Sequence, residues 1–375
     1  MRVPNALDPS SYTTPSEQMH RLMFLGSKVV KKPQGCSTDY QWIPTDFEVG
    51  EGGEAGSDRG NVAVRILSYI NNLHPEQHAD LYESIGSIFG RFVPLFERML
   101  AYRTGLLKSS FDVDTISHDS WRALPRRPRL PEFVELPKKA ETVNLRGKTL
   151  QAIVKIAEII LTPENPEYGG GAWHIEGTPS EKIIGTGIYY FDCENIQDSR
   201  LSFRSQVEEP PYQQSDDAGI AEIYGLFNEE LLVQDFGSVQ TLASRCLVFP
   251  NLLQHQVQPF KLDNPSKPGV RKILAFFLVD PDDPIPSTSV IPPQQEEWIE
   301  PTLEVIMENL HLVDAVERNI HSLLPRGMSL LVAKQHRLQL MAQHKKTKKI
   351  RTATRATFRY ASTKKSREDS KQVAS

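Results

Sequence analysis

The chain has 375 residues, of which 39% are hydrophobic and 24% charged, and its formal net charge is −4. This length and composition exclude a largely disordered chain and allow a large core in one domain or two. Its three cysteines are widely spaced, which excludes a zinc ribbon and a disulfide framework and favours a reducing, intracellular location. We expect neither a secretory signal nor a membrane span, because no apolar run approaches about 18 residues.

The N-terminal third combines an irregular segment with a helical region. Residues 1–60 are rich in Pro, Gly and Ser, which predicts a mostly irregular segment. Residues 61–140 are predicted to form a helical support region that begins with a short strand over 61–70. Apolar residues then recur at helical spacing over 81–100, and Pro94 is expected to kink or split that helix.

The pattern changes to β-structure over residues 141–285. Residues 148–162 are apolar on both faces, and although a helix is allowed by propensity, their β-branched content favours a central strand. Short β-rich runs separated by turn clusters follow, at 183–192, 200–207, 238–249, 255–262 and 271–280. This spacing predicts an α+β chain with a mainly β core, a double-stranded β-helix (jelly roll or cupin-like) with flanking helices.

The C-terminal part has a different character. Residues 286–344 predict two or three surface helices, with the clearest helix start at Pro301. Residues 345–375 are basic and poor in apolar side chains, which predicts a disordered tail. Residues 334–375 carry thirteen Lys or Arg and two acidic residues, a net +11, so the rest carries −15. A nuclear-import signal and a solvated tail without a role are the two interpretations, and DNA binding is not expected.

The residues most telling of chemistry are His174, Glu176 and His255. Residues two apart on a strand share a face, so His174 and Glu176 would point the same way. With a later histidine, this is the order of the 2-His-1-carboxylate facial triad, which binds Fe(II) and leaves three coordination positions open. A lone His-x-Glu occurs often by chance and usually makes ordinary hydrogen bonds, so the prediction depends on His255 and the β-rich context.

Arg271 opens the last apolar strand and would hold the far carboxylate of a 2-oxo acid through a two-point contact. If its strand pairs with that of His255, the loop at 263–269 returns Arg271 to the metal. Arg271 and Lys272 then point to opposite faces, and we expect Arg271 to face inward. Tyr189 or Thr186 could hydrogen-bond the same co-substrate. The predicted cofactors are therefore Fe(II) and 2-oxoglutarate.

Other motifs are weaker. His74 and His78 have the spacing of a helical metal pair, but His74 precedes a proline, so a surface pair is favoured. Residues 235–237 spell a kinase-like DFG without its companion motifs and are interpreted as a turn. Arg204 is interpreted as a surface arginine of a strand, and Trp173 as a packing residue beneath the metal strand.

Several segments together resemble a fungal family of large proteins of unassigned function, whose core is similar to the double-stranded β-helix of 2-oxoglutarate oxygenases. They are YGGGAWHIEG, GTGIYYFDCENI, LSFR, FPNLLQHQVQPFKL and PGVRKILAFFLVDP, and the resemblance covers about residues 37–345. It implies iron at His174, Glu176 and His255, with 2-oxoglutarate at Arg271. Two features depart from the general oxygenase pattern. The carboxylate is Glu rather than Asp, and the long interval before Arg271 must be absorbed by the 263–269 loop.

The predicted function is that of an Fe(II)- and 2-oxoglutarate-dependent oxygenase. It would hydroxylate or otherwise oxidise an unknown small molecule or peptide with O₂, while 2-oxoglutarate becomes succinate and CO₂. One alternative is a non-catalytic jelly-roll binding or scaffold protein, and another is a cupin-type metal-dependent isomerase or hydrolase. Iron-dependent consumption of 2-oxoglutarate separates these hypotheses. The expected location is cytoplasmic or nuclear, without membrane or nucleic-acid partners.

Overall fold

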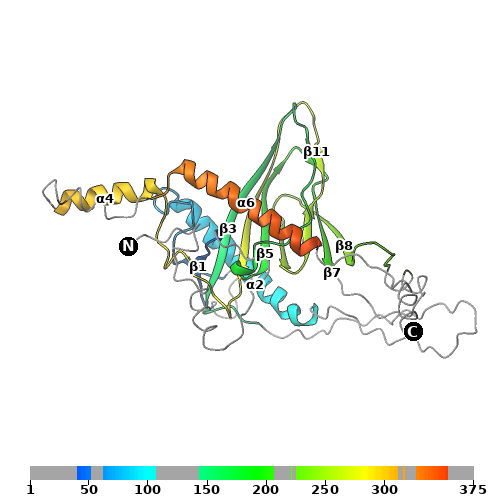
Figure 1. Cartoon of the computed structure of the whole chain (residues 1–375), viewed down its shortest axis with the longest axis horizontal. Coiled ribbons are helices and arrows are strands. Elements are labelled where there is room, and N and C mark those ends of the chain that lie inside the picture. Colours follow the sequence, from blue (N-terminus) through cyan, green and yellow to red (C-terminus); the bar gives the residue numbers. More distant parts are fainter. Residues whose placement is uncertain are drawn as a thin grey trace, which may run out of the picture.

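The described part of the chain is mainly antiparallel β-sheet with few helices (Figure 1). The computed structural model describes residues 40–51, 62–106, 143–206, 225–310 and 327–353, and the single positions 221 and 316. The predictions for most of residues 1–60, for residues 107–140 of the helical support region and for the tail after Ala353 therefore lie outside the described residues. Within the described ranges, no helix is both long enough and apolar enough to cross a membrane.

A six-stranded antiparallel sheet forms the centre of the molecule. In spatial order its strands are β2 (Val64–Ile66), β1 (Thr45–Val49), β3 (Thr149–Leu161), β12 (Gly269–Val279), β5 (Ile183–Glu194) and β9 (Cys246–Pro250). The central strand predicted over 148–162 is confirmed as β3. β12 pairs along its length with β3 on one side and β5 on the other, so both of its edges are occupied.

Two three-stranded sheets complete the β-structure. One has the order β10 (Gln254–Val257), β7 (Arg200–Gln206), β8 (Val233–Gln240), and the other has the order β4 (Glu167–Tyr168), β11 (Phe260–Leu262), β6 (Ile196–Gln197). A single antiparallel bridge joins His174 to His255, so the His174 segment lies beside β10. β11 follows β10 after two residues, and β7 follows β6 after two residues. β4 precedes the His174 segment along the chain, so each strand of the second small sheet is close in sequence to a strand or segment of the first.

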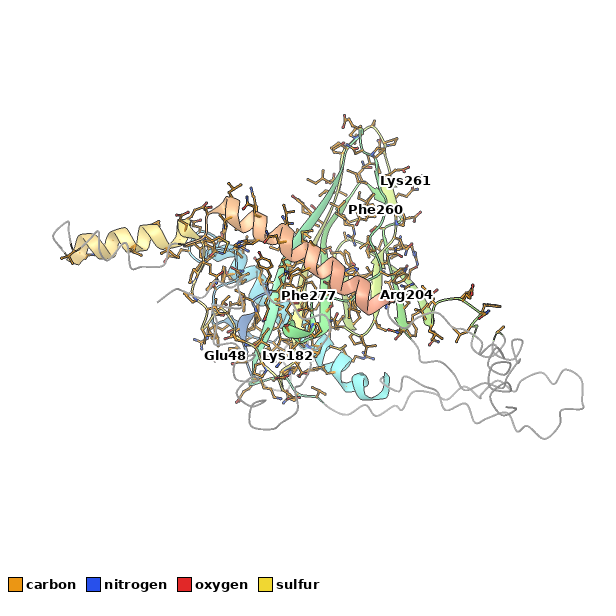
Figure 2. All side chains as sticks on the ribbon, viewed as in Figure 1. Glu48, Lys182, Arg204, Phe260, Lys261 and Phe277 are labelled. Atoms are coloured by element: carbon orange, nitrogen blue, oxygen red, sulfur yellow. The ribbon has the colours of Figure 1, made fainter. Side chains whose placement is uncertain are left out.

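The second small sheet and the upper ends of β3, β5 and β12 form a long arm, which rises to the tip at β11 in Figure 1. Figure 2 shows Phe260 and Lys261 on this arm, away from Phe277 and Arg204. The strand pairing corrects one expectation. β12 pairs with β3 and β5 and not with β10, so the strands of His255 and Arg271 are not the antiparallel neighbours that the sequence analysis considered. The β-rich run predicted over 255–262 is divided into β10 and β11, and the turn after Leu262 leads into β12.

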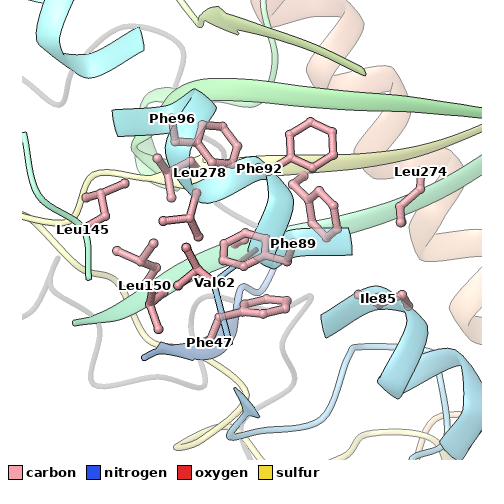
Figure 3. Close-up of a cluster of buried hydrophobic side chains, with 14 of the residues drawn as sticks. Phe47, Val62, Ile85, Phe89, Phe92, Phe96, Leu145, Leu150, Leu274 and Leu278 are labelled. Atoms are coloured by element: carbon pink, nitrogen blue, oxygen red, sulfur yellow. The ribbon is translucent and has the colours of Figure 1, made fainter. Parts of the chain in front are cut away.

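Helix α2 (Ala79–Leu106) covers one face of the large sheet. Its apolar side chains recur at helical spacing and pack on the sheet, with the Phe47 and Phe89 rings 4.2 Å apart (Figure 3). The helix continues through Pro94, so the predicted split does not occur. A Cβ at Gly187 of β5 would lie 2.6 Å from the Phe92 ring, so only glycine allows this close approach of helix and sheet.

The other face of the large sheet encloses an interior with the β10-β7-β8 sheet. Alternation along β12 divides its side chains: Leu274, Phe276 and Leu278 pack with α2, whereas Ile273, Ala275 and Phe277 face the interior. Trp42 closes part of this interior by stacking on Phe277, with ring centroids 5.3 Å apart. The interior is therefore lined by apolar side chains from both sheets, and polar groups that point into it lose contact with water.

Two helices follow the sheets. Helix α4 (Glu296–Leu310) begins before Pro301, which lies inside it, so the predicted start at Pro301 is too late. Helix α6 (Leu330–Ala353) continues past residue 344, and the predicted tail boundary moves accordingly. Leu340 is buried, and the Tyr40 ring lies 5.4 Å from that of His336, which ties α6 to the start of the described chain.

Candidate metal centre

The side chains of His174, Glu176 and His255 converge in the interior between the sheets. Glu176 Oε1 lies 3.4 Å from His174 Nε2 and 3.3 Å from His255 Nε2. One ligand atom from each residue lies within 4.8 Å of those of the other two. His174 is 21% exposed, whereas Glu176 and His255 are 8% and 3% exposed, so the site meets solvent on the His174 side. The sequence prediction that these side chains would meet is realised in the geometry, and their role as ligands stays a prediction.

Local structure explains how the two histidines come together. The His174–His255 bridge is closed by two backbone hydrogen bonds, of 3.1 and 2.8 Å, so the two residues are direct cross-strand neighbours. Side chains at such positions lie close together on one face, and the two imidazole centroids are 4.4 Å apart. Glu176 lies two residues beyond His174 and points to the same side. The Phe249 ring packs edge-on against His255 at 5.0 Å and supports it from the large sheet.

The tautomer of His174 is set by its backbone. His174 Nδ1 lies 2.7 Å from the carbonyl oxygen of Ala172, so Nδ1 carries the proton and donates it. The lone pair of Nε2 is then directed at Glu176 Oε1, which is itself an acceptor. Two acceptors face each other at this point, and a cation or a shared proton must lie between them. This arrangement is typical of a metal-binding histidine whose second nitrogen is held by a backbone carbonyl.

The protonation states of Glu176 and His255 favour metal binding at neutral pH. Burial by itself would raise the pKa of Glu176, but hydrogen bonds and charge interactions with the two imidazoles hold it well below its usual range. Burial lowers the pKa of His255, although the adjacent Glu176 acts in the opposite direction. The carboxylate is therefore ionised and the His255 imidazole tends to be neutral, which are the forms that bind divalent metals.

The two His–Glu separations fit a divalent transition metal, and since the three ligand atoms lie within 4.8 Å of one another, the two imidazoles would draw together around a bound ion. Two donors with bonds of about 2.1 Å lie about 3.0 Å apart at a right angle and about 3.4 Å apart at a tetrahedral angle. The two His–Glu separations of 3.3 and 3.4 Å match these values. Two imidazoles and one carboxylate also match the ligand preferences of iron, and three ligands leave positions open. Among the described residues, this is the cluster of His, Cys, Asp or Glu side chains that could hold a metal ion.

Arg271, near the start of β12, faces the same interior as His174, Glu176 and His255. It is 3% exposed, and its guanidinium stacks at 4.8 Å from the Tyr190 ring and 5.7 Å from the Phe260 ring. In register Arg271 pairs with Cys193, whereas Tyr190 pairs with Ile273, so the side chain leans along β12 in the direction of His255. No carboxylate of the described residues forms an ion pair with it, and a buried guanidinium without an anion is costly.

Two of the three candidate co-substrate contacts face this interior and one does not. Thr186 is fully buried on the inner face of β5, because its cross-strand partners Phe249 and Phe277 belong to the interior cluster. Tyr189 packs with the α2 cluster on the opposite face, so its predicted role is wrong. Alternation puts Tyr190 inside instead, and the sequence could not separate two adjacent tyrosines by composition.

Buried polar atoms without a partner in the described part of the chain occur at Arg271 and along the inner face of β5. Thr186 Oγ1, the Tyr190 hydroxyl and Arg271 Nε have no hydrogen-bond partner of good geometry among the described residues. Burial raises the pKa of Tyr190 to about 12, although the nearby Arg271 acts in the opposite direction. The phenol therefore keeps its proton and remains a donor. Buried polar atoms are rarely left unpaired, so these groups suit a polar ligand or water.

The structure also places two further basic residues that the sequence analysis considered, Lys272 and Arg204. Lys272 pairs with Asp192 at 2.9 Å on the outer face, opposite to Arg271, as expected. Arg204 is not a free surface residue: its guanidinium stacks at 4.4 Å over the Trp173 ring and its Nε donates to Gln254 at 2.8 Å. Trp173 and Gln254 directly precede the two histidines, so Arg204 joins the segments that carry them. The sequence carried no signal for this contact.

The chain was also compared with known proteins. The family model described as "Protein of unknown function (DUF4246)" matches residues 7–302. The chain belongs to this family. Membership of DUF4246 confirms the expectation of a family of unassigned function. No curated protein matches the chain.

Two solved structures are similar to this DUF4246 member at low level. One is the Fe(II)/α-ketoglutarate-dependent dioxygenase TqaL, with 13% identity, a TM-score of 0.29, and coverage of 72% of this chain and 77% of that one. The other is a bsmA homologue from Methylobium petroleophilum PM1, with 10% identity, a TM-score of 0.28, and coverage of 71% and 82%. Likenesses at this level leave the function to be argued from the site itself.

Proposed function

We propose that this DUF4246 protein is an Fe(II)- and 2-oxoglutarate-dependent oxygenase with a double-stranded β-helix core. The observation that carries the proposal is one enclosed interior that combines a metal-sized triangle of His174, Glu176 and His255 with the unneutralised guanidinium of Arg271. The first set binds a metal with open positions, and the second binds an anionic group. 2-Oxoglutarate suits both features, because one end of it chelates a metal and the other end is a carboxylate that a guanidinium can bind.

The order of the strands supports the double-stranded β-helix. The short strands β4, β6 and β11 of the arm are left out of this count. If β3 is then the first strand of the roll and the His174 segment the second, β5, β7, β8, β9 and β10 follow, and β12 is the eighth. The large sheet then holds strands one, eight, three and six side by side, and the opposed sheet holds two, seven, four and five. This is the strand order of a hairpin ribbon rolled on itself, the jelly-roll arrangement. Both ligand histidines come from neighbouring strands of the smaller sheet.

The residues divide into three roles. His174, Glu176 and His255 would hold iron, and Arg271 with the Tyr190 hydroxyl would hold the far carboxylate of 2-oxoglutarate. Thr186, which faces the same interior, is a further hydrogen-bond donor for the co-substrate. Bound iron with 2-oxoglutarate and O₂ supplies the oxidation of a C–H bond. The chain itself orients these groups and excludes water with the apolar side chains of the interior, such as Phe249 and Phe277.

One observation favours a second function, a metal-dependent jelly-roll protein that does not use 2-oxoglutarate. Arg271 lies near Phe260, which is five residues beyond His255, or about 16 Å along an extended strand. The lean of the Arg271 side chain towards Tyr190 shortens this separation. Whether the guanidinium reaches a metal-bound co-substrate is therefore the decisive question, and it has a direct test.

The test compares Arg271→Ala with Lys272→Ala. Both remove one cation from neighbouring positions of β12, but only the first removes an inward one. Arg271→Ala should weaken 2-oxoglutarate binding by at least about tenfold, since charge-assisted hydrogen bonds contribute about 1.5–3 kcal/mol, and should leave metal affinity unchanged. Lys272→Ala should change neither.

Binding is measured by calorimetry with Mn(II) and 2-oxoglutarate under argon, and turnover by succinate formation with Fe(II) in air. Unchanged 2-oxoglutarate affinity in Arg271→Ala would remove the co-substrate role. Metal binding without any succinate, with or without added peptide or small-molecule substrates, would favour the second function. Equal loss of metal and 2-oxoglutarate binding in Arg271→Ala would point to a damaged fold, which a thermal melt of the same sample detects.

A further inference from the structure

The backbone of Glu176 is held by a single side chain. Glu176 lies between the isolated His174–His255 bridge and the short helix η2 (Pro179–Glu181), outside any described strand. Its N–H donates to Asn251 Oδ1 at 2.8 Å, and its carbonyl oxygen accepts from Asn251 Nδ2 at 2.9 Å. The carboxamide thus pairs with both peptide groups of Glu176, as a neighbouring strand would.

Asn251 is itself fixed to the large sheet. It follows β9 directly, its backbone N–H donates to the carbonyl of Ile184 at 2.9 Å, and its Nδ2 also donates to the carbonyl of Ile183 at 3.0 Å. Both amide hydrogens and the amide oxygen are therefore used. The reversed amide would set NH₂ against the Glu176 N–H, so the network defines one orientation. Asn251 consequently links Glu176 to the start of β5 across the interior.

We propose that Asn251 is a positioning residue that fixes the carboxylate ligand of the metal centre. This inference rests on the proposed function only in taking Glu176 as a ligand. A glutamate has one more rotatable bond than an aspartate, so the place of its carboxylate depends more on a fixed backbone. The following Gly177 has φ +65°, in the left-handed region that favours glycine, so the chain turns directly after Glu176 and no strand continues from it. Without Asn251, described contacts would hold the Glu176 backbone only through its neighbours.

The chain offers a matched control in Asn195. Its Nδ2 donates to the carbonyls of Asn264, Lys267 and Pro268 at 2.9–3.1 Å, and its Oδ1 accepts from the Asn264 N–H at 2.7 Å. Asn195 therefore secures backbone in the same way, but in the hairpin at the tip of the arm rather than at the metal centre. Loss of either side-chain amide should lower the stability of the fold, but only loss of Asn251 should change the affinity for a metal and its spectrum.

The experiment titrates Co(II) into the full chain, its Asn251→Ala variant and its Asn195→Ala variant. Loss of a residue that orients a ligand typically weakens metal binding by about 10–100-fold. We expect a rise of that size in the Kd of Asn251→Ala, together with an altered visible Co(II) spectrum, because the carboxylate changes position. Asn195→Ala should keep the wild-type Kd and spectrum, while thermal melts show the stability lost by each variant.

A second variant covers the case in which Asn251→Ala does not fold. Asn251→Gln keeps the amide but displaces it by one methylene, and should bind Co(II) more weakly than wild type. Wild-type affinity and spectrum in a folded Ala or Gln variant would overturn the inference, as would equal weakening in Asn195→Ala. If wild type binds no Co(II), both proposals fail. If it binds Co(II) and the Asn251 effect is seen without succinate formation, the positioning role stands and the oxygenase function fails.

Discussion

His174, Glu176 and His255 bring acceptor atoms together in a place where water has little access. Hydrogen bonds normally pair a donor with an acceptor, and here the Nδ1 contact of His174 removes its proton from the shared side. The contact between Glu176 Oε1 and His174 Nε2 therefore joins two acceptors, and the proposed ligand role accounts for it, since a bound cation would lie between them. That interpretation makes the site sensitive to protons, which compete with a metal for the same lone pairs.

Acid should weaken metal binding through the imidazole of His255 rather than through the carboxylate of Glu176. The pKa of Glu176 is well below its usual range, so it stays ionised in weak acid, and burial lowers the pKa of His255, so this imidazole is neutral at about pH 7. As the pH falls from about 7 to about 5, a proton increasingly occupies the His255 lone pair, and the Kd for Co(II) should rise. Co(II) titrations across this range test it, and a constant Kd would contradict it.

The contact between β5 and α2 depends on a glycine. A Cβ at Gly187 would lie 2.6–2.8 Å from Phe92 atoms, whereas one at Gly169 would meet nothing within 4 Å. Gly187→Ala should therefore lower the free energy of unfolding by about 1–3 kcal/mol through overpacking, and Gly169→Ala should be close to neutral. Urea melts of both variants measure this. Because Gly187 faces α2 and not the interior, Co(II) affinity should stay at the wild-type value in Gly187→Ala.

Long strands were predictable and short ones were not. The segments that became β3, β5 and β12 each carry enough β-branched and apolar residues to be recognised as strands. β4 and β6 have two residues each, too few for any periodic pattern, so the small sheet that they form with β11 was not predicted.

The site shows the same division between local and distant information. The order of His174, Glu176 and His255 was readable because a two-residue spacing on a strand fixes a shared face. Which tyrosine faces inward was not, because Tyr189 and Tyr190 are alike in composition and only the sheet register separates them. Asn251 was missed because its bonds to Glu176 join positions 75 residues apart, and such contacts have no periodic signature.

Charge is divided unevenly over the whole molecule, with +11 in residues 334–375 and −15 elsewhere. Part of that positive charge lies on α6, which crosses the sheets in Figure 1 and extends to Ala353. A basic helix attached to an acidic body can act as a recognition signal at its end without contributing to the core. The nuclear-import hypothesis therefore concerns lysines of this helix as well as the residues after it.

Replacing Lys345, Lys346, Lys348 and Lys349 with Gln should alter location in the cell and leave the melting temperature unchanged. The matched control replaces four later cations instead: Lys364, Lys365, Arg367 and Lys371. Imaging of tagged full-length chains, with thermal melts of the purified proteins, gives both results. If the two variants and wild type are distributed alike, the import hypothesis is removed. A large fall in melting temperature in the first variant would show that these lysines support the fold.

β12 is paired on both edges and buried on both faces, with an interior that needs Arg271 and an outer face that accepts Lys272. A single inserted or deleted residue within it would rotate one end of the strand by half a turn and exchange these two side chains. The compact ammonium group of Lys272 would then replace the flat guanidinium group of Arg271, which offers two parallel donors, in the interior between the sheets. Over evolutionary time this strand can therefore lengthen or shorten only in pairs of residues, and each pair would move Arg271 about 6.6 Å away from the side chains of His174, Glu176 and His255 or toward them.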